Sequence, residues 1–166
     1  MSAFQLDEDV NSRRLARECK QSGLSQVKRF PRKLRGIGTL DPSVLERVTP
    51  KDTLLTGDLS LARDHTRSIP AHHCGIIALG NSEEIMWTVT DKDYRRIIAN
   101  FKRQFPEWQA CEFSNSILTI TERDVLIQHA EGQSLVDDEY LTFDSPGWQN
   151  RLRTILNANT TRRLSS

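Results

Sequence analysis

Short apolar runs alternate with amphipathic stretches through the first half of the chain. Four of the runs have the length and composition of buried strands: residues 3–6, 24–27, 53–56 and 75–79. Between them, apolar positions recur every three to four residues, which is the period of a helix with one buried face. These patterns predict helices at 10–22, from Asp41 to before Pro50, and irregularly at 59–68. Strands that alternate with helices predict a mainly parallel sheet with helices on both faces.

The second half begins with the clearest helix pattern of the chain, at residues 91–105. Its apolar positions share one face, and we expect them in the core rather than at a dimer or partner surface: Tyr94, Ile97, Ile98, Phe101 and Phe105. Residues 116–121 and 125–130 alternate polar and apolar positions, which predicts an antiparallel hairpin turning at 122–124. A short helix at 148–156 follows, and the polar residues 157–166 predict a flexible C-terminal tail.

These elements predict one α/β domain over residues 1–156, with the hairpin added at one edge of the sheet. A chain of 166 residues is long enough for a substantial core. The net charge of +1 excludes attraction of the whole molecule to nucleic acid, so any such binding needs a local patch. Three widely spaced cysteines favour free thiols in a reducing compartment. No apolar run approaches the roughly 20 residues of a membrane span, so we expect a soluble, cytoplasmic protein.

Three aspartates lie beside the predicted strands. Asp7 follows the first strand, Asp41 opens a helix beside the sheet, and Asp58 follows the strand 53–56 after one glycine. Ligands bind outside the carboxyl ends of strands in α/β sheets, so we expect these acids at one rim. A hard cation such as Mg²⁺ would offset their mutual repulsion and activate water at a phosphodiester. Each acid also has a structural alternative, because Asp41 fits a helix cap and the other two fit turns.

A cluster of cations follows the second predicted strand. Five of the eight residues from 28 to 35 are basic: Lys28, Arg29, Arg32, Lys33 and Arg35. Phe30 lies among them and is available to stack on a base, so the segment suits single-stranded RNA. The alternative is a solvated loop with no partner.

Four motifs occur in order over residues 4 to 80: Phe4-Gln-Leu-Asp7-Glu8-Asp9 with Arg14-Leu-Ala-Arg17, Gly36-Ile-Gly-Thr-Leu-Asp41, Leu54-Leu-Thr56-Gly-Asp58, and Gly75-Ile-Ile-Ala-Leu79. Their order and spacing resemble the PIN-like domain family. The resemblance is closest to its compact bacterial subgroup, which is related to the Mut7-C ribonuclease domain and to toxin–antitoxin ribonucleases. The resemblance implies a three-layer PIN-like fold with a mainly parallel central sheet and a C-terminal antiparallel hairpin.

The resemblance also implies a metal-dependent endoribonuclease that hydrolyses RNA phosphodiesters. Asp7, Asp41 and Asp58 would hold Mg²⁺ or Mn²⁺, with Glu8 as a helper. Members are similar to the toxins of toxin–antitoxin pairs, which implies an antitoxin partner and a homodimer. Two positions depart from the subgroup: Asp9 replaces an asparagine, and Ser60 replaces a second acid after the third motif. The change at Ser60 leaves a second interpretation open, a weakly active or silent PIN-like module that binds RNA or a protein partner.

Overall fold

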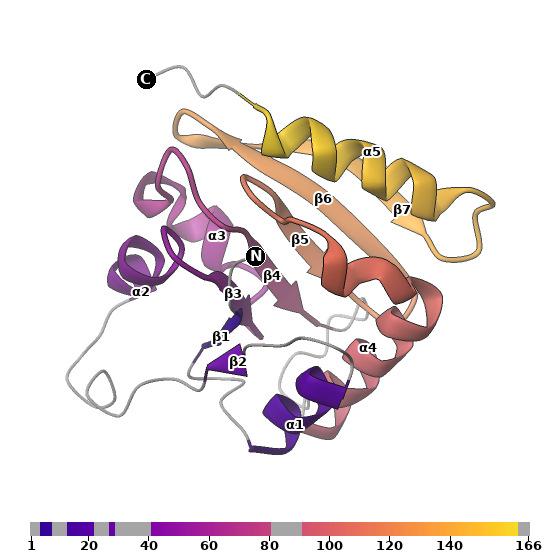
Figure 1. Ribbon diagram of the computed structural model, residues 1–166. Coiled ribbons are helices and arrows are strands. Elements are labelled where there is room, and N and C mark those ends of the chain that lie inside the picture. Colours follow the sequence, from indigo (N-terminus) through magenta and orange to yellow (C-terminus); the bar gives the residue numbers. More distant parts are fainter. Residues whose placement is uncertain (1–3, 8–12, 22–26, 29–40, 81–90, 163–166) are drawn as a thin grey trace.

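Seven strands of the described residues form one sheet (Figure 1). The computed structural model describes residues 4–7, 13–21, 27–28, 41–80 and 91–162. The strands are β1 (Phe4–Leu6), β2 (Val27–Lys28), β3 (Thr53–Thr56), β4 (Ile76–Leu79), β5 (Ile117–Ile120), β6 (Asp124–Glu131) and β7 (Ser134–Thr142). Their order across the sheet is β2-β1-β3-β4-β5-β6-β7, with β1 to β5 parallel and β6 and β7 antiparallel to their neighbours. The predicted α/β class, the mainly parallel sheet and the hairpin of β5 and β6 are confirmed.

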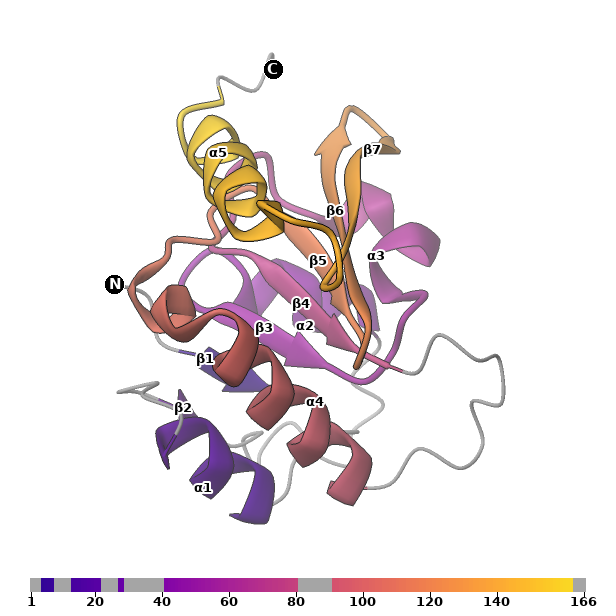
Figure 2. The same cartoon turned by 90° about the vertical axis from the view of Figure 1, so that its right-hand side faces the viewer.

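Helices cover both faces of this sheet (Figure 1, Figure 2). They are α1 (Arg13–Gln21), α2 (Asp41–Val48), α3 (Leu61–Asp64), α4 (Asp91–Gln104) and α5 (Trp148–Thr160). Successive side chains of a strand point to opposite faces, so neighbours on β3 belong to different layers. Leu55 packs with α1, α4 and α5 in the larger core cluster, whereas Leu54 packs with α2 and α3 in the smaller one.

The apolar stripe of α4 forms the centre of the larger core cluster, as its period predicts. All five predicted positions are buried: Tyr94, Ile97, Ile98, Phe101 and Phe105. Phe101 meets Trp108 edge to face with ring centroids 5.7 Å apart, a geometry that aromatic pairs favour. Because this stripe is fully occupied by the protein's own core, the alternative of a dimer or partner surface on α4 is wrong.

The predicted helix at 59–68 is broken into two short pieces. It consists of α3 and a 3-10 helix, Thr66–Ser68, separated by His65 with φ −126°, which is not a helical value. The Thr66 hydroxyl donates to the carbonyl of Ala62 over 2.8 Å. A side chain that bonds to the backbone of the preceding turn competes with regular helix hydrogen bonding. Two short helical pieces therefore cover this part of the sheet, on the face that also carries α2.

The last helix is longer than its predicted span of 148–156. Helix α5 continues to Thr160, so the prediction of a flexible tail is wrong for residues 157–160. Asn159 is fully buried and its amide donates to Ser116 and Asp138, both over 3.1 Å. A polar residue inside the core is expected to be hydrogen-bonded in this way. Ser116 directly precedes β5 and Asp138 lies on β7, so these bonds hold the end of the helix against the sheet.

Strand β7 has no counterpart among the predictions. It pairs with β6 after a two-residue turn in which Gly132 has φ +63°, a left-handed value that favours glycine. Three consecutive acids, residues 137–139, interrupt the apolar alternation of its sequence. Charged side chains suit the outer strand of a sheet, because they oppose pairing with a further chain.

The remaining predictions concern the membrane and the cysteines. None of the helices in the described part of the chain has the length and apolar character that spanning a bilayer requires. Cys19, Cys74 and Cys111 are all free thiols. Burial, with a smaller contribution from Glu18, raises the pKa of the Cys19 thiol to about 12, so it behaves as a core residue rather than a nucleophile.

Candidate functional site

The order of the sheet reverses at β1 and β3. The chain leaves β1 for β2 on one side and returns to β3 on the other side of β1. Helices α1 and α2 therefore lie on opposite faces and diverge from the carboxyl edge, where α/β sheets bind ligands. Asp7 follows β1 directly, and Asp58 follows β3 after one glycine. Two of the predicted acids thus flank the point at which the strand order reverses.

The hydroxyl of Thr56 joins these two acids. It donates to Oδ2 of Asp7 over 2.8 Å and accepts from the backbone N–H of Asp58 over 3.1 Å. Asp7 is 7% exposed and Thr56 is fully buried, so the link lies almost out of water. The backbone N–H of Asp7 also donates to the carbonyl of Leu55 over 2.8 Å, which holds the end of β1 against β3. Strand register therefore connects the Asp7 carboxylate, through the Thr56 hydroxyl, to the backbone of Asp58.

Ser60 orients the second acid. Both its backbone N–H and its hydroxyl donate to Oδ1 of Asp58, over 3.0 and 2.9 Å. Among the described residues, the hydrogen bonds to the Asp58 carboxylate are these two, and both go to Oδ1. The position at which the resembling subgroup has a second acid thus supplies a donor that fixes Asp58.

Gly57 lets helix α4 approach this site. A Cβ at this position would collide with the phenol ring of Tyr94, with the ring carbon Cζ only 2.7 Å away. Any larger residue between Thr56 and Asp58 would displace Tyr94, so the glycine allows the side chain of Tyr94 to pack against the backbone that carries both hydrogen bonds. The turn is supported from the α4 side of the sheet.

The other predicted acids are only partly described. Asp41 is the first residue of α2, and α2 joins the amino end of β3 through the turn of residues 49–52. The side chain of Asp41, and Glu8 altogether, lie outside the described part of the chain. Asp64, the next acid in the sequence after Asp58, lies on α3, where its half-exposed carboxylate pairs with Arg63 at 3.6 Å. A contribution of Asp41 or Glu8 to the site stays a prediction.

The predicted RNA-binding cations lie almost entirely outside the described residues. Lys28 is the last residue of β2, at the same edge of the sheet as Asp7. Four further cations fall in the segment 29–40, which the structure does not describe: Arg29, Arg32, Lys33 and Arg35. Their role as a phosphate contact stays a prediction.

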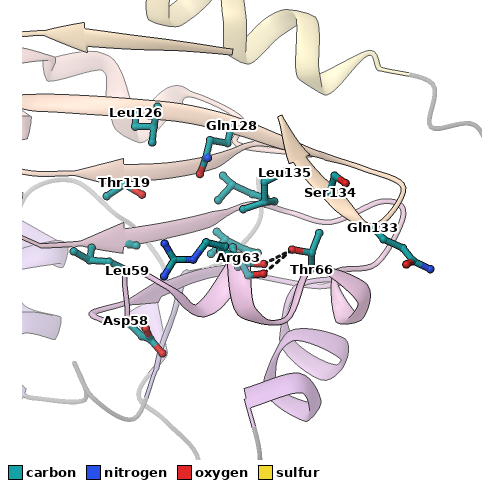
Figure 3. A pocket seen from close by; sticks show the side chains of 14 residues that line it. Asp58, Leu59, Arg63, Thr66, Thr119, Leu126, Gln128, Gln133, Ser134 and Leu135 are labelled. Carbon is teal, nitrogen blue, oxygen red and sulfur yellow. Dashed lines mark hydrogen bonds between the residues drawn. The ribbon is translucent and has the colours of Figure 1, made fainter. Parts of the chain in front are cut away.

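A cavity of about 550 Å³ adjoins Asp58 on the α3 face of the sheet (Figure 3). It extends from Asp58 and Leu59, past α3, to the turn between β6 and β7 at Gln133 and Ser134. Its size lies within the range of about 300–1,000 Å³ typical of ligand sites. Sequence reasoning misses it, because it depends on the shortness of α3 and on β7.

Histidine and cysteine side chains lie elsewhere. His73 is buried just before β4, at the opposite edge of the sheet, and its Nδ1 accepts from the backbone N–H of Gly75 over 3.1 Å. Burial, and to a lesser extent His72, lower the pKa of His73 to about 4. The imidazole is therefore neutral near pH 7 and serves the turn into β4.

The donor set at Asp7 and Asp58 fits a hard divalent cation. Mg²⁺ is commonly held by one or two carboxylates, with water and substrate phosphate completing its shell. No group of three or more His, Cys, Asp or Glu side chains within the described ranges is placed to hold a metal ion. The side chain of Asp41, the third predicted ligand, lies outside those ranges. No protein-family model matches the chain, and no curated protein or solved structure is significantly similar to it.

Proposed function

We propose that the protein is a metal-dependent endoribonuclease with a three-layer PIN-like fold. The observation that carries the proposal is the pair Asp7 and Asp58, joined by the Thr56 hydroxyl at the edge where the strand order reverses. Two carboxylates at this edge of an α/β sheet are an arrangement suited to a divalent cation and a phosphate ligand. The motif order of residues 4 to 80 supports the same family.

In this proposal, some residues bind the metal ion and others orient those ligands. Asp7 and Asp58 would hold Mg²⁺ or Mn²⁺, joined by Asp41, with Glu8 beside them. The bound ion would supply Lewis-acid activation of water and of the scissile phosphodiester. Thr56 holds the Asp7 carboxylate and Ser60 holds that of Asp58, so each proposed ligand has a hydrogen-bond donor that fixes its orientation.

The substrate and partners follow from the cations and from the resemblance. The basic residues of the segment 28–35 would contact the phosphate backbone of single-stranded RNA. A toxin of a toxin–antitoxin pair, with an antitoxin partner and a homodimeric assembly, is the biological setting that the PIN-like resemblance supports.

A second candidate is a weakly active or silent PIN-like module that binds RNA or a protein. The observation that favours it is Ser60, which hydrogen-bonds to Asp58 at the position where the subgroup has an acid. One fewer carboxylate weakens the electrostatic attraction for a divalent ion. The two candidates differ in a measurable way, because only the nuclease cleaves the RNA that it binds.

The deciding experiment measures cleavage of single-stranded RNA with Mn²⁺ and with EDTA. We expect cleavage with Mn²⁺, none with EDTA, and a loss of about a hundredfold or more in Asp7→Asn and Asp58→Asn, since each removes a charged metal ligand. Asp144→Asn, an exposed aspartate after β7, is the matched control and should cleave normally. Cleavage that persists in EDTA and in both site variants contradicts the proposal. RNA binding without cleavage favours the silent module.

A further inference from the structure

The cavity beside Asp58 has a flat floor made by three strands. Two rows of directly paired residues form it: Ala78, Thr119 and Leu126, and next to them Ile76, Ile117 and Gln128. Neighbouring strands are about 4.8 Å apart, and same-face residues along a strand about 7 Å apart. The floor is therefore a platform about one aromatic ring system wide, with the small Ala78 leaving room above it.

Two opposing walls close this platform into a groove, which we call the α3 groove. One wall is α3 with Leu59 and Arg63, and the other is the β6–β7 turn with Ser134 and Leu135. Between the pairs of Ile127 and Gln128, β7 carries one extra residue, Asp138, an irregularity that bends a strand, and β7 contacts both α3 and the following 3-10 helix. Figure 3 shows Arg63 and Gln128 reaching into the space from opposite sides.

The chemistry of the α3 groove suits an uncharged, planar group. Among the described residues that line it, only Asp58 and Arg63 carry a charge, so it is poorly suited to a phosphate group. The floor is mostly apolar, whereas uncharged hydrogen-bonding side chains stand at intervals: Thr119, Gln128, Gln133 and Ser134. The hydroxyl of Thr119 makes no side-chain hydrogen bond to another residue of the described ranges, although the residue is half-buried.

Gln128 is held in place for recognition, whereas Arg63 is free to move over a bound group. The amide nitrogen of Gln128 donates to Asp137 across the hairpin over 2.6 Å, which fixes the side chain and leaves its carbonyl oxygen as an acceptor. Arg63 is 76% exposed and its pairing with Asp64 at 3.6 Å is a surface ion pair, which is weak. The guanidinium is therefore able to stack over a base, as arginine does on unpaired RNA bases.

We propose that the α3 groove binds one unpaired nucleobase of the RNA, next to the phosphodiester held at Asp7 and Asp58. This assignment rests on the proposed ribonuclease function, since Asp58 belongs both to the acid pair and to the groove wall. The base lies on the Ala78–Thr119–Leu126 row, Arg63 covers it, and Thr119 and Gln128 meet its hydrogen-bonding edge. A base within a duplex has that edge occupied and both faces stacked, so the substrate is single-stranded at this nucleotide.

The test is an abasic scan of a short fluorescein-labelled oligoribonucleotide of mixed sequence. Affinity is measured by fluorescence anisotropy in EDTA, with one base removed at each position in turn. We expect one position, next to the linkage that is cleaved with Mn²⁺, to lose about tenfold in affinity, the size of one base contact. The same position should show no loss in Arg63→Ala or in Thr119→Leu, because these variants have already lost the groove contacts.

Matched controls separate the groove from general effects. Arg67→Ala removes another exposed arginine, on the neighbouring 3-10 helix, and Thr142→Leu changes a half-exposed strand threonine, both outside the cavity. Both should retain the position-specific loss. Arg63 is on the surface, so its variant tests the proposal even where Thr119→Leu disturbs folding.

The outcomes distinguish this proposal from the ribonuclease on which it rests. An abasic loss that is equal in wild type and both groove variants overturns the groove, whether or not RNA is cleaved. A loss that disappears in the groove variants while no RNA is cleaved overturns the nuclease and supports the base site. Duplex RNA bound as tightly as single-stranded RNA, or no RNA bound at all, overturns the base site.

Discussion

Two aspartates of this protein are equally buried and each accepts a hydrogen bond from a threonine, but their other hydrogen-bond partners differ. Asp7 and Asp124 are each 7% exposed, and each accepts a hydrogen bond from a threonine hydroxyl, Thr56 over 2.8 Å and Thr121 over 2.6 Å. Asp124 lies at the start of β6, and its other oxygen accepts from Tyr140 on the neighbouring strand. Both of its oxygens are thus satisfied by neutral hydroxyls within a single hairpin unit.

The threonine at Asp7 has a different second partner. Thr56 accepts from the backbone of another acidic residue, Asp58, whereas Thr121 accepts from the N–H groups of Arg123 and of Asp124 itself. The Thr121 arrangement closes a turn, a common use of threonine and aspartate. The Thr56 arrangement joins the Asp7 carboxylate to the backbone of Asp58, across the ends of two strands and beside a cavity. Burial and a hydroxyl donor are therefore common to both acids, and what distinguishes Asp7 is the second acidic residue linked through its threonine.

The largest effect is expected from removing each threonine hydroxyl in turn. Thr56→Val should lower the rate of RNA cleavage about 10- to 100-fold, because residues that orient metal ligands typically contribute that much. Thr121→Val should leave cleavage unchanged. Both should lose about 1–3 kcal/mol of unfolding free energy, since each leaves a buried acceptor short of a donor.

Cleavage kinetics with Mn²⁺ and urea denaturation of both variants provide the measurement. Thr56→Ser, which restores the hydroxyl, is the control and should recover most of the rate. Equal losses of cleavage in Thr56→Val and Thr121→Val would show that the rate follows stability and that the two sites do not differ.

The fold was predictable where burial imposes a simple period. Leu54, Leu55 and the stripe of α4 are apolar because they lie in the core, and the boundaries of β3 and α4 agree with the predictions within one residue. Strand β7 lies at the edge of the sheet, where three consecutive acids, residues 137–139, interrupt the apolar alternation, so alternation alone does not reveal it. The glycine at 132 carried the available signal, because a Gly-led pair between two runs indicates a hairpin.

Only those parts of the site that follow directly from the ends of strands could be predicted from the sequence. Asp7 and Asp58 each follow an apolar run, and the parallel order of β1 and β3 brings them to one edge. The hydrogen bonds of Thr56 and Ser60 depend on register and on a tight turn, which the sequence does not specify. The cavity depends on helix α3 being one turn long. The helix ends at His65 and Thr66, without the glycine or proline that would mark its end in the sequence.

A smaller effect is expected from the divalent ion. Mn²⁺ at ten times its dissociation constant should add about 1.4 kcal/mol to the unfolding free energy of the wild type, because it binds only the folded chain. Asp124→Asn should keep this gain and Asp58→Asn should lose it. Urea denaturation with and without Mn²⁺ measures both. A gain that persists in Asp58→Asn and Asp7→Asn would place the ion elsewhere and would remove the distinction between the two acids.

The smallest effect on stability is expected from Tyr140, which is 59% exposed and donates a hydrogen bond to the second oxygen of Asp124. Its hydrogen bond to Asp124, with smaller contributions from desolvation and from the carboxylate charge, raises the pKa of the phenol above its usual value of 10.0. The fold therefore favours the neutral phenol, and the hydrogen bond stabilises fully below about pH 10 and is lost as the pH rises through the raised pKa. The stability difference between wild type and Tyr140→Phe should be small, constant from neutral pH to about pH 9, and absent in strong alkali.

Phenolate absorbance tests the cause of this shift. The chain has two tyrosines, so subtracting the titration of Tyr140→Phe isolates Tyr140. In Asp124→Asn the pKa of Tyr140 should fall toward 10, because an amide oxygen accepts a weaker hydrogen bond than a carboxylate and carries no charge for the phenolate to oppose. In Asp58→Asn it should not move. An unchanged titration in Asp124→Asn would mean that Tyr140 does not hydrogen-bond to the Asp124 carboxylate in solution. The difference between Asp124 and Asp7 would then rest on the hydrogen bonds of Thr56 alone.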